Sequence, residues 1–342
     1  GFIGSHLAEA ISKLGHQVFV LDNFCTGRIE NLENIRHKIE IIDDSIDVYG
    51  AWSKVFKDAD WVFHLAALAD IVPSIEKPED YFAVNVNGTF NVLRASREAQ
   101  VSRFIYTASS SCYGLPDEFP TQENAQIQPQ YPYALTKWLG EELALHWAQV
   151  YQLPALSLRL FNVYGPRQSL TNFYQGVVTN FMANILQEQP IIIHSDGEQT
   201  RDFIYVEDVV NAWVKALDAP RTHGQVFNLG SGEGITINRL ADITLAAFDR
   251  NRDTHTVLYE PVRPGDLRYI ERIEDADGEV VYQAPAPGKP DADPACDEIT
   301  AYQVHDMLRD SLVNGNLAAE AATLKQQPFP GAIKTGTTHE FA

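Results

Sequence analysis

The sequence predicts an α/β protein built on a doubly wound parallel sheet, and three observations support this prediction. Apolar runs of strand length alternate with longer amphipathic segments through the first two hundred of the 342 residues, as expected of βαβ units. The short runs are rich in Val, Ile, Leu and Phe, which is typical of parallel strands buried on both faces. A glycine pair, Gly1 and Gly4, opens the first amphipathic segment.

The first part of the chain supplies the strands and helices of the main sheet. Strands are expected at Gln17–Asp22, Ile39–Asp43, Trp61–Ala67, Arg103–Ser109 and Ala155–Asn162. Helices are expected at Gly4–Leu14, Glu79–Gln100 and Tyr133–Tyr151. Because each long segment returns the chain to the next apolar run, the strands are expected to be parallel.

After Pro166 the segments shorten, which predicts a smaller α/β lobe beside the sheet. Its strands are expected at Ile191–His194 and Val226–Leu229, and its helices near Gly176–Gln187, Val206–Leu217 and Ile237–Phe248. We therefore expect a nucleotide-binding domain over residues 1–165, an incomplete substrate-binding lobe over 166–268 and an unrelated tail over 269–342. Within the tail, residues 284–294 are rich in Pro, Ala and Asp, a composition typical of an extended linker.

Composition and charge exclude several classes of protein. Lys and Arg total 26 against 46 Asp and Glu, giving a net charge of −20, which argues against a general nucleic-acid binder. A small phosphate-bearing ligand needs only a few local donors and stays compatible. The three cysteines show no disulfide or zinc spacing. Because no signal peptide or long apolar run is visible, we expect a cytoplasmic protein without a membrane partner.

The glycine pair and a downstream acid suggest a dinucleotide site. Gly1 and Gly4 stand at a helix start, where free N–H groups and the helix dipole favour a pyrophosphate. Asp22 ends the next strand, and an acid about 20 residues after a glycine turn binds the hydroxyls of an adenosine ribose. Because Asp22 would repel a 2′-phosphate, NAD is favoured over NADP, although Arg28 weakens that preference slightly.

Further residues are expected along the same cofactor. Asp44 and Ser45 follow the second strand, and small residues after His64 let the backbone approach a dinucleotide, while His64 itself is expected to be packed. Asn85 is a polar residue early in a long helix. The predicted cofactor residues are Gly1, Phe2, Ile3, Gly4, Asp22, Asn23, Asp44, Ser45, Leu65, Ala66, Ala67, Asn85, Tyr133 and Lys137.

A tyrosine and a lysine form the candidate catalytic pair. Tyr133 and Lys137 lie at i and i+4, so they share one face of a helix. A phenol titrates at about pH 10 in water; a nearby ammonium or a positive nicotinamide ring lowers that pKa, so Tyr133 could exchange a proton near neutral pH. Ser109, at the end of an upstream strand, is expected to hydrogen-bond the same substrate hydroxyl.

A series of segments resembles a known family in order and spacing. They are GFIGSH, VFVLDN, VFHLAA, NVNGTFNVL, YTASSSCYG, YPYALTK, RLFNVYGPRQ, DGEQTRDFIYVEDV, FNLGSG and RPGD. Residues 1–268 resemble the extended short-chain dehydrogenase/reductases, specifically the NAD-dependent epimerase/dehydratases close to UDP-glucose and UDP-N-acetylglucosamine 4-epimerases. The resemblance implies a Rossmann-like fold whose first strand, ahead of the glycine turn, is missing from this sequence.

The same resemblance implies roles for individual residues and for partners. Ser109, Tyr133 and Lys137 match the family's catalytic Ser/Thr, Tyr and Lys. The implied substrate-side residues are Ser110, Asn162, Arg201 and Arg263. Guanidinium groups suit phosphate oxygens, so the two arginines are expected to hold a nucleotide-diphosphate sugar, with UDP favoured. A homodimer formed through the helix containing Tyr133 and the Glu79–Gln100 helix is also implied.

Two positions after Ser109 narrow the reaction. The related 4,6-dehydratases carry Asp-Glu there and the decarboxylases carry Ser-Glu, whereas this chain has Ser110 and Ser111. The missing glutamate removes the acid/base needed near C5 or C6 of the sugar, while a 4-epimerase requires only Ser, Tyr, Lys and NAD. Epimerisation is therefore favoured, and an NAD-dependent reductase or dehydratase of the same fold, or an inactive chimeric fragment, are the alternatives.

The tail carries a different resemblance. YIERIEDADGEVVYQ, TAYQVHDMLRDSLVNGN and PGAIKTGTT are similar to the transpeptidase domain of penicillin-binding proteins, whose edge strand bears the KTGT motif found here at 334–337. That family also needs a Ser-x-x-Lys nucleophile and a Ser-x-Asn motif, and residues 269–342 contain neither. We therefore expect one fragment joined to another, without transpeptidase activity.

Overall fold

The computed structural model describes residues 1–170, 176–260, 272–274 and 280–283. The chain divides into two units: Gly1–Ile193 with Gly197–Leu258, and His194–Asp196 with Tyr259–Ala342. In the second unit, β12 (Arg272–Glu274) pairs antiparallel with β13 (Val280–Gln283). The boundary expected at residue 165 stays a prediction.

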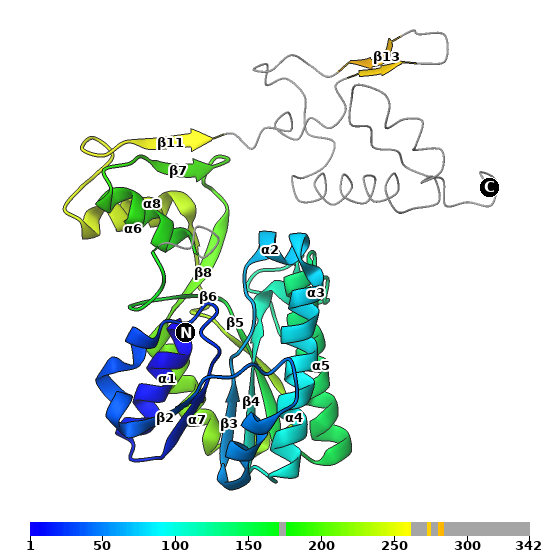
Figure 1. The fold of residues 1–342 in the computed structure, drawn as a ribbon. Helices are drawn as coiled ribbons and strands as arrows, with labels where there is room; N and C mark the ends of the chain where they lie inside the picture. The colour runs from blue at the N-terminus through cyan, green and yellow to red at the C-terminus, as the bar shows by residue number, and fades with distance from the viewer. Residues whose placement is uncertain (171–175, 261–271, 275–279, 284–342) are drawn as a thin grey trace, which may run out of the picture. The chain divides into compact units, whose positions relative to one another are not determined.

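A four-stranded parallel sheet in the order β3-β4-β5-β9 forms the centre of the first unit (Figure 1). Its strands are β3 (Trp61–His64), β4 (Arg103–Ser109), β5 (Ala155–Leu160) and β9 (Val226–Leu229). Phe104 and Tyr106 of β4 pack with α4 and α5, whereas Ile105 packs with α1 and α7. This alternation, which follows from the two-residue period of a strand, places helices on both faces of the sheet.

The helices around this sheet follow the predicted pattern with shifts at their ends. The main ones are α1 (Phe2–Lys13), α4 (Thr89–Glu98), α5 (Pro132–Tyr151) and α7 (Val206–Leu217). Shorter helical segments are η1 (Ile29–Lys38), η2 (Ala51–Asp58), α2 (Ile71–Glu76), α3 (Pro78–Tyr81), η3 (Phe82–Gly88), η4 (Ser110–Tyr113) and η5 (Pro220–Thr222). No helix among the described residues is long and apolar enough to span a membrane.

The predicted helix Glu79–Gln100 is interrupted by the π-helical segment η3 between α3 and α4. A Cβ atom on Gly88, at the end of η3, would lie 2.8 Å from the Ile46 side chain, so only glycine permits this close approach. Asn85 lies in the same segment with its side chain turned into the protein. The spacing of apolar residues in the sequence predicted a helix here, but it did not predict the π-helical segment in which Asn85 is buried.

The first parallel strands form a sheet of their own. β1 (Val18–Leu21) pairs with β2 (Ile39–Ile42) in parallel, and among the described residues no ladder joins β1 to β3. The residues of β1 and β2 are intermediate or exposed, whereas those of β5 are all buried. The predicted parallel sheet is therefore present in two parts, and within the described ranges β1 pairs only with β2 and β3 only with β4.

A second layer of shorter strands follows the main sheet. The predicted strand Ala155–Asn162 ends at Leu160, and β6 (Asn162–Tyr164) joins β8 (Thr200–Tyr205) and β10 (Gly234–Thr236) in a three-stranded sheet.

The helices α6 (Val177–Leu186) and α8 (Ile237–Ala247) share an apolar core with β7 (Ile191–His194). β7 pairs with β11 (Val257–Glu260).

A glycine brings helix α5 unusually close to the central sheet. A Cβ atom on Gly140 would lie 2.2 Å from the Tyr106 hydroxyl of β4. The Tyr106 hydroxyl donates a 3.0 Å hydrogen bond to the main-chain carbonyl oxygen of Lys137 on α5. The close approach therefore fixes α5 against β4 next to two of the residues predicted to be catalytic.

We expect Gly140→Ala to destabilise the protein, although alanine is the better helix former by about 1 kcal/mol. The added methyl group must displace Tyr106 or α5, which should lower the free energy of unfolding by about 1–3 kcal/mol. Denaturant unfolding measures this. Gly50→Ala is the control, because its Cβ would meet nothing closer than 3.8 Å; equal stabilities of the two variants would contradict the close-contact argument.

Candidate active site

The glycine turn and the acid at the end of β1 adjoin in the structure. The nitrogen of Gly1 lies 3.1 Å from Oδ2 of Asp22, although 21 residues separate them in sequence. Phe2, Ile3 and Gly4 form the first turn of α1. A helix start next to a carboxylate fits the pyrophosphate and ribose of a dinucleotide.

The residues predicted to lie along the adenosine come together at the ends of β1 and β2. Asn23 donates a 3.3 Å hydrogen bond from Nδ2 to Oγ of Ser45. Asp44 follows β2, and its carboxylate accepts a 2.8 Å hydrogen bond from the backbone amide of Ser45. The structure thus brings Asn23, Asp44 and Ser45 into one cluster, and Asn23 and Asp44 are exposed.

Asn85 supports the cofactor loop from behind. It is 1% exposed, and its side-chain oxygen accepts a 2.8 Å bond from the amide of Leu68. Its Nδ2 donates to the carbonyl of Leu68 and to Oγ1 of Thr136 on α5, both at 3.0 Å. These bonds hold the loop that continues from Leu65, Ala66 and Ala67, and a place for Asn85 along the cofactor stays a prediction.

His64 is a packed residue, as the sequence suggested. It is buried at the end of β3 and its Nε2 lies 2.8 Å from Oγ1 of Thr89. Burial lowers the pKa of His64 to about 3, and the nearby Lys137 charge adds to the effect. The imidazole is therefore neutral across the physiological range.

Ser109 and Tyr133 meet at the carboxyl end of β4. Ser109 Oγ accepts hydrogen bonds from the amide and the hydroxyl of Ser111, at 3.2 Å and 2.8 Å. Ser109 also hydrogen-bonds Tyr133, which favours the ionised phenol. Tyr133 and Lys137 share the inner side of α5, so the three predicted catalytic residues converge from two elements.

Burial changes the proton affinities of this pair from those expected. The sequence suggested that Lys137 would lower the pKa of Tyr133, but burial raises the pKa of Tyr133 above its ordinary value, and the Asp70 carboxylate adds to the rise. Burial lowers the pKa of Lys137 to about 7, opposed by the Glu141 carboxylate. Desolvation disfavours the charged form of each group, and it is the largest influence on both pKa values.

The predicted substrate-side residues lie on neighbouring short strands. Asn162 of β6 donates a 2.8 Å bond from Nδ2 to the carbonyl oxygen of Asp202 on β8. Arg201 is exposed beside it. Burial raises the pKa of Tyr131, one residue before α5, to about 12, and the positive charge of Arg201 opposes this rise. Ser110 follows Ser109 at the start of η4. Arg263 lies outside the described residues.

Sequence reasoning missed two acids that organise the site. Asp202 receives hydrogen bonds from the amides of Ser231 and Gly232, at 2.7 Å and 2.9 Å, which ties β8 to the turn after β9. Glu141 is 1% exposed beneath Lys137. Its i+4 spacing from Lys137 was the available signal, but spacing alone does not distinguish a buried acid from a solvated one.

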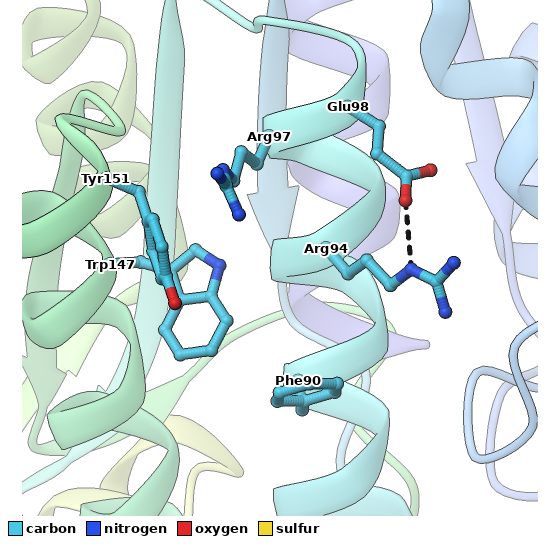
Figure 2. A pocket seen from close by; sticks show the side chains of 6 residues that line it. All are labelled: Phe90, Arg94, Arg97, Glu98, Trp147 and Tyr151. Carbon is cyan, nitrogen blue, oxygen red and sulfur yellow. Dashed lines mark hydrogen bonds and ion pairs between the residues drawn. The ribbon is translucent and has the colours of Figure 1, made fainter.

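A separate groove of about 470 Å³ lies between α4 and α5 (Figure 2). Its lining residues are Phe90, Arg94, Arg97, Glu98, Trp147 and Tyr151. The rings of Phe90 and Trp147 are 5.4 Å apart, and the Arg97 guanidinium lies 4.0 Å above the Tyr151 ring. None of the predicted catalytic or cofactor residues lines this groove.

Comparison with known proteins identifies the family. The profile of the NAD dependent epimerase/dehydratase family matches residues 1–230. The chain belongs to this family. The Rossmann-like fold predicted from sequence is confirmed, and NAD is the cofactor.

Relatives of this family member differ in their reactions. The UDP-glucose 4-epimerase of Mycolicibacterium smegmatis is 35% identical over 274 residues, covering 78% of this chain and 85% of that protein. The UDP-N-acetyl-alpha-D-glucosaminuronate decarboxylase of Bacillus cytotoxicus is 34% identical over 276 residues, covering 79% and 84%. The Thermus thermophilus UDP-glucose 4-epimerase complex with NAD has a TM-score of 0.69 and 32% identity, covering 78% and 85%.

The expected relation of residues 269–342 to penicillin-binding proteins is not supported. The family match ends at residue 230, and the comparisons do not support the similarity to penicillin-binding proteins. The KTGT motif, residues 334–337, lies outside the described residues, as does the expected linker 284–294.

We expect Asp22→Ala to relax the preference of this epimerase-family protein for NAD over NADP. Removing the carboxylate would remove its repulsion of a 2′-phosphate and the hydrogen bonds that we expect it to make to the ribose. Equilibrium titration of both dinucleotides measures the change. Glu40→Ala on the paired strand β2 alters net charge equally and should leave the ratio of affinities unchanged; the same ratio in Asp22→Ala would remove Asp22 from the cofactor site.

Proposed function

We propose that the chain is an NAD-dependent nucleotide-sugar 4-epimerase acting on a UDP-sugar. The observation that carries this proposal is the hydroxyl of Ser111, which lies 2.8 Å from Ser109 Oγ. Decarboxylases and dehydratases of this family place a glutamate at that position. A hydroxyl bound to Ser109 cannot supply an additional acid/base near C5 or C6 of the sugar, whereas 4-epimerisation does not need one.

The proposed reaction uses Tyr133 as the group that exchanges the proton of the sugar 4-hydroxyl. Ser109 shares a hydrogen bond with Tyr133, so it is placed to orient the same hydroxyl. The glycine turn and Asp22 would hold NAD, which would supply a hydride acceptor for C4 and the hydride that is returned to the opposite face of the 4-keto sugar. A protonated Lys137, one helical turn along α5, would favour the ionised phenol. Because the phenol that accepts the proton also returns it, epimerisation requires no second acid.

The substrate is held, in this proposal, by the short strands beside the sheet. Arg201 is exposed on β8 and its charge reaches Tyr131 at the start of α5. A guanidinium there can bind the diphosphate of a UDP-sugar in the bidentate geometry it favours. Asn162, bonded to the backbone of Asp202, would contact the sugar or the linking phosphate from the same edge.

Product and cofactor stoichiometry test the proposed reaction. The full chain is incubated with NAD and UDP-glucose, and we expect UDP-galactose to form without net accumulation of NADH at 340 nm. A keto-sugar reductase would consume or produce one reduced cofactor per turnover. A decarboxylase would release CO2 from UDP-glucuronate, and an inactive fragment would convert none of these substrates.

Tyr133→Phe should reduce the rate of epimerisation by about 10²–10⁴-fold, because it removes the proton acceptor and keeps the ring. The matched control is Tyr131→Phe, since the two rings are parallel and 6.5 Å apart but Tyr131 precedes the helix turn that faces Lys137. Initial rates at saturating UDP-sugar measure both. Wild-type turnover by Tyr133→Phe would show that the catalytic residue has been misassigned.

We also propose that a second copy of the chain covers the groove between α4 and α5. Phe90 is 44% exposed and Tyr151 is 39% exposed, although both belong to the two helices that line it. Arg97 and Glu98 place opposite charges beside these rings, which suits a two-fold interface in which each copy presents the same face. The resemblance noted from sequence implies the same helices.

Phe90→Glu should therefore convert a dimer into a monomer, because it introduces two like charges at the centre of a two-fold interface. Light scattering after size-exclusion chromatography reports the molar mass. Phe19→Glu, which alters a 37% exposed phenylalanine on β1, should leave the mass unchanged. Dimers of unchanged stability in Phe90→Glu would argue against this interface.

A further inference from the structure

A buried polar network beneath α5 is not used by the chemistry proposed above. Its members come from α5, β5, η4 and β9, and most are closed to solvent. They are Glu141, Ser157, Arg159, Tyr113 and Asn228. Charged groups are rarely kept inside a protein without a reason, because burying them costs free energy unless they are paired.

Glu141 is the centre of this network. Its carboxylate accepts a 2.8 Å bond from the hydroxyl of Ser157, a 3.1 Å bond from Nε of Arg159 and a 2.5 Å bond from Nη2 of Arg159. Arg159 is 5% exposed, and its two-pronged contact with the carboxylate fixes both side chains. Glu141 therefore attaches the catalytic helix α5 to the central strand β5.

Arg159 extends this hydrogen-bond network to the segment that contains Ser109 and Tyr113. Its Nη1 donates to the Tyr113 hydroxyl at 2.7 Å and to the carbonyl of Glu123 at 3.1 Å. Tyr113 ends η4, the turn that starts directly after Ser109, and its hydroxyl donates to Oδ1 of Asn228 at 2.7 Å. A continuous chain of bonds thus links the Lys137 side of α5 to the Ser109 turn.

Glu141 is also the nearby countercharge for Lys137. The other ionisable groups around Lys137 are Tyr106 on β4, whose ring centroid lies 4.5 Å from Nζ, His64 on β3 and, one helical turn away on α5, Tyr133. The Arg159 guanidinium of β5 pairs with Glu141 itself. His64 is neutral at physiological pH and both phenols have raised pKa values, so none of them supplies a negative charge. The carboxylate one helical turn away opposes the loss of the Lys137 proton.

We propose that Glu141, bound to Arg159, is a positioning residue for the catalytic centre: it fixes the Ser109 turn relative to α5 and supplies the countercharge of the Lys137 ammonium. This inference rests on the proposed function for the roles of Ser109 and Lys137. Glu141 contacts neither substrate nor cofactor in this scheme; it acts through Lys137 and, by way of Arg159 and Tyr113, through Ser109.

Glu141→Gln tests the countercharge, because it keeps the shape of the side chain and removes its charge. We expect the pKa of Lys137 to fall from about 7 by about one unit. Carbon-13 NMR of the full chain with labelled lysine reads this pKa directly, the Lys137 resonance being assigned by its absence in Lys137→Met. In the pH profile of kcat, the limb that falls as Lys137 loses its proton should move to lower pH by the same amount.

Two control variants separate charge from packing. Glu141→Asp keeps the charge and should keep the pKa of Lys137 close to that of the unsubstituted chain. Ser157→Ala removes one hydrogen bond to Glu141 and no charge, so it should leave that pKa unchanged. A Lys137 pKa in Glu141→Gln equal to that of the unsubstituted chain would overturn the countercharge, whether or not the protein is an epimerase.

Tyr113→Phe tests the attachment of the Ser109 turn and does not depend on how Glu141→Gln folds. It removes the hydroxyl between Arg159 and Asn228 without changing any charge. We expect kcat to fall at least about tenfold with KM and the pKa of Lys137 unchanged. Unchanged kcat would overturn the positioning role. If no variant and not even the unsubstituted chain epimerises, while the pKa shift in Glu141→Gln occurs, the proposed function fails and the countercharge stands.

Discussion

Helix α5 buries an ammonium and a carboxylate against a sheet whose other inward side chains are mostly apolar. Lys137 is 5% exposed and Glu141 is 1% exposed, and each would be strongly unfavourable there without a partner. Residues on two adjacent strands meet this requirement: the Tyr106 ring of β4 lies 4.5 Å from the Lys137 ammonium, and Ser157 and Arg159 of β5 bind the Glu141 carboxylate. In the parallel register of β4 and β5, Tyr106 lies opposite Ser157, so these groups lie next to one another under α5.

A partly exposed ion pair and a hydrogen bond connect α1 to the segment after β6. The segment after β6 returns to the cofactor helix, where Nε2 of His6 lies 2.9 Å from the carbonyl of Pro166 and Arg167 pairs with Glu9. The lysine and arginine partners of Glu9 lower the pKa of that carboxyl to about 2, so the ion pair persists through mild acid. The helix that starts at the glycine turn is therefore bonded directly to the chain that carries Asn162.

Sequence patterns predicted the regular elements well where one physical rule dominates. The strand Arg103–Ser109 and the helix Val206–Leu217 have the predicted bounds, because a buried parallel strand is a short apolar run and α7 has a clear apolar stripe. β8 was missed because Thr200, Arg201 and Asp202 give it a polar start. The site was harder to predict, since the inward turn of Asn85, the burial of Glu141 and the raised pKa of Tyr133 all depend on neighbours distant in sequence.

The neutral histidine behind the cofactor loop makes folding sensitive to acid. In an unfolded chain His64 would titrate near its ordinary value of 6.5, but in the folded protein its pKa is about 3. Between these values the unfolded state binds the extra proton, so the stability that is fully present above about pH 6.5 declines as the pH falls towards 3. His64 bonds Thr89, four residues after Asn85, and Thr89 in turn donates to the Asn85 carbonyl. Proton uptake by His64 therefore destabilises the packing around Thr89 and Asn85, which supports the loop after β3. As the pH falls, this buried packing would be lost before the ion pair of Glu9 is.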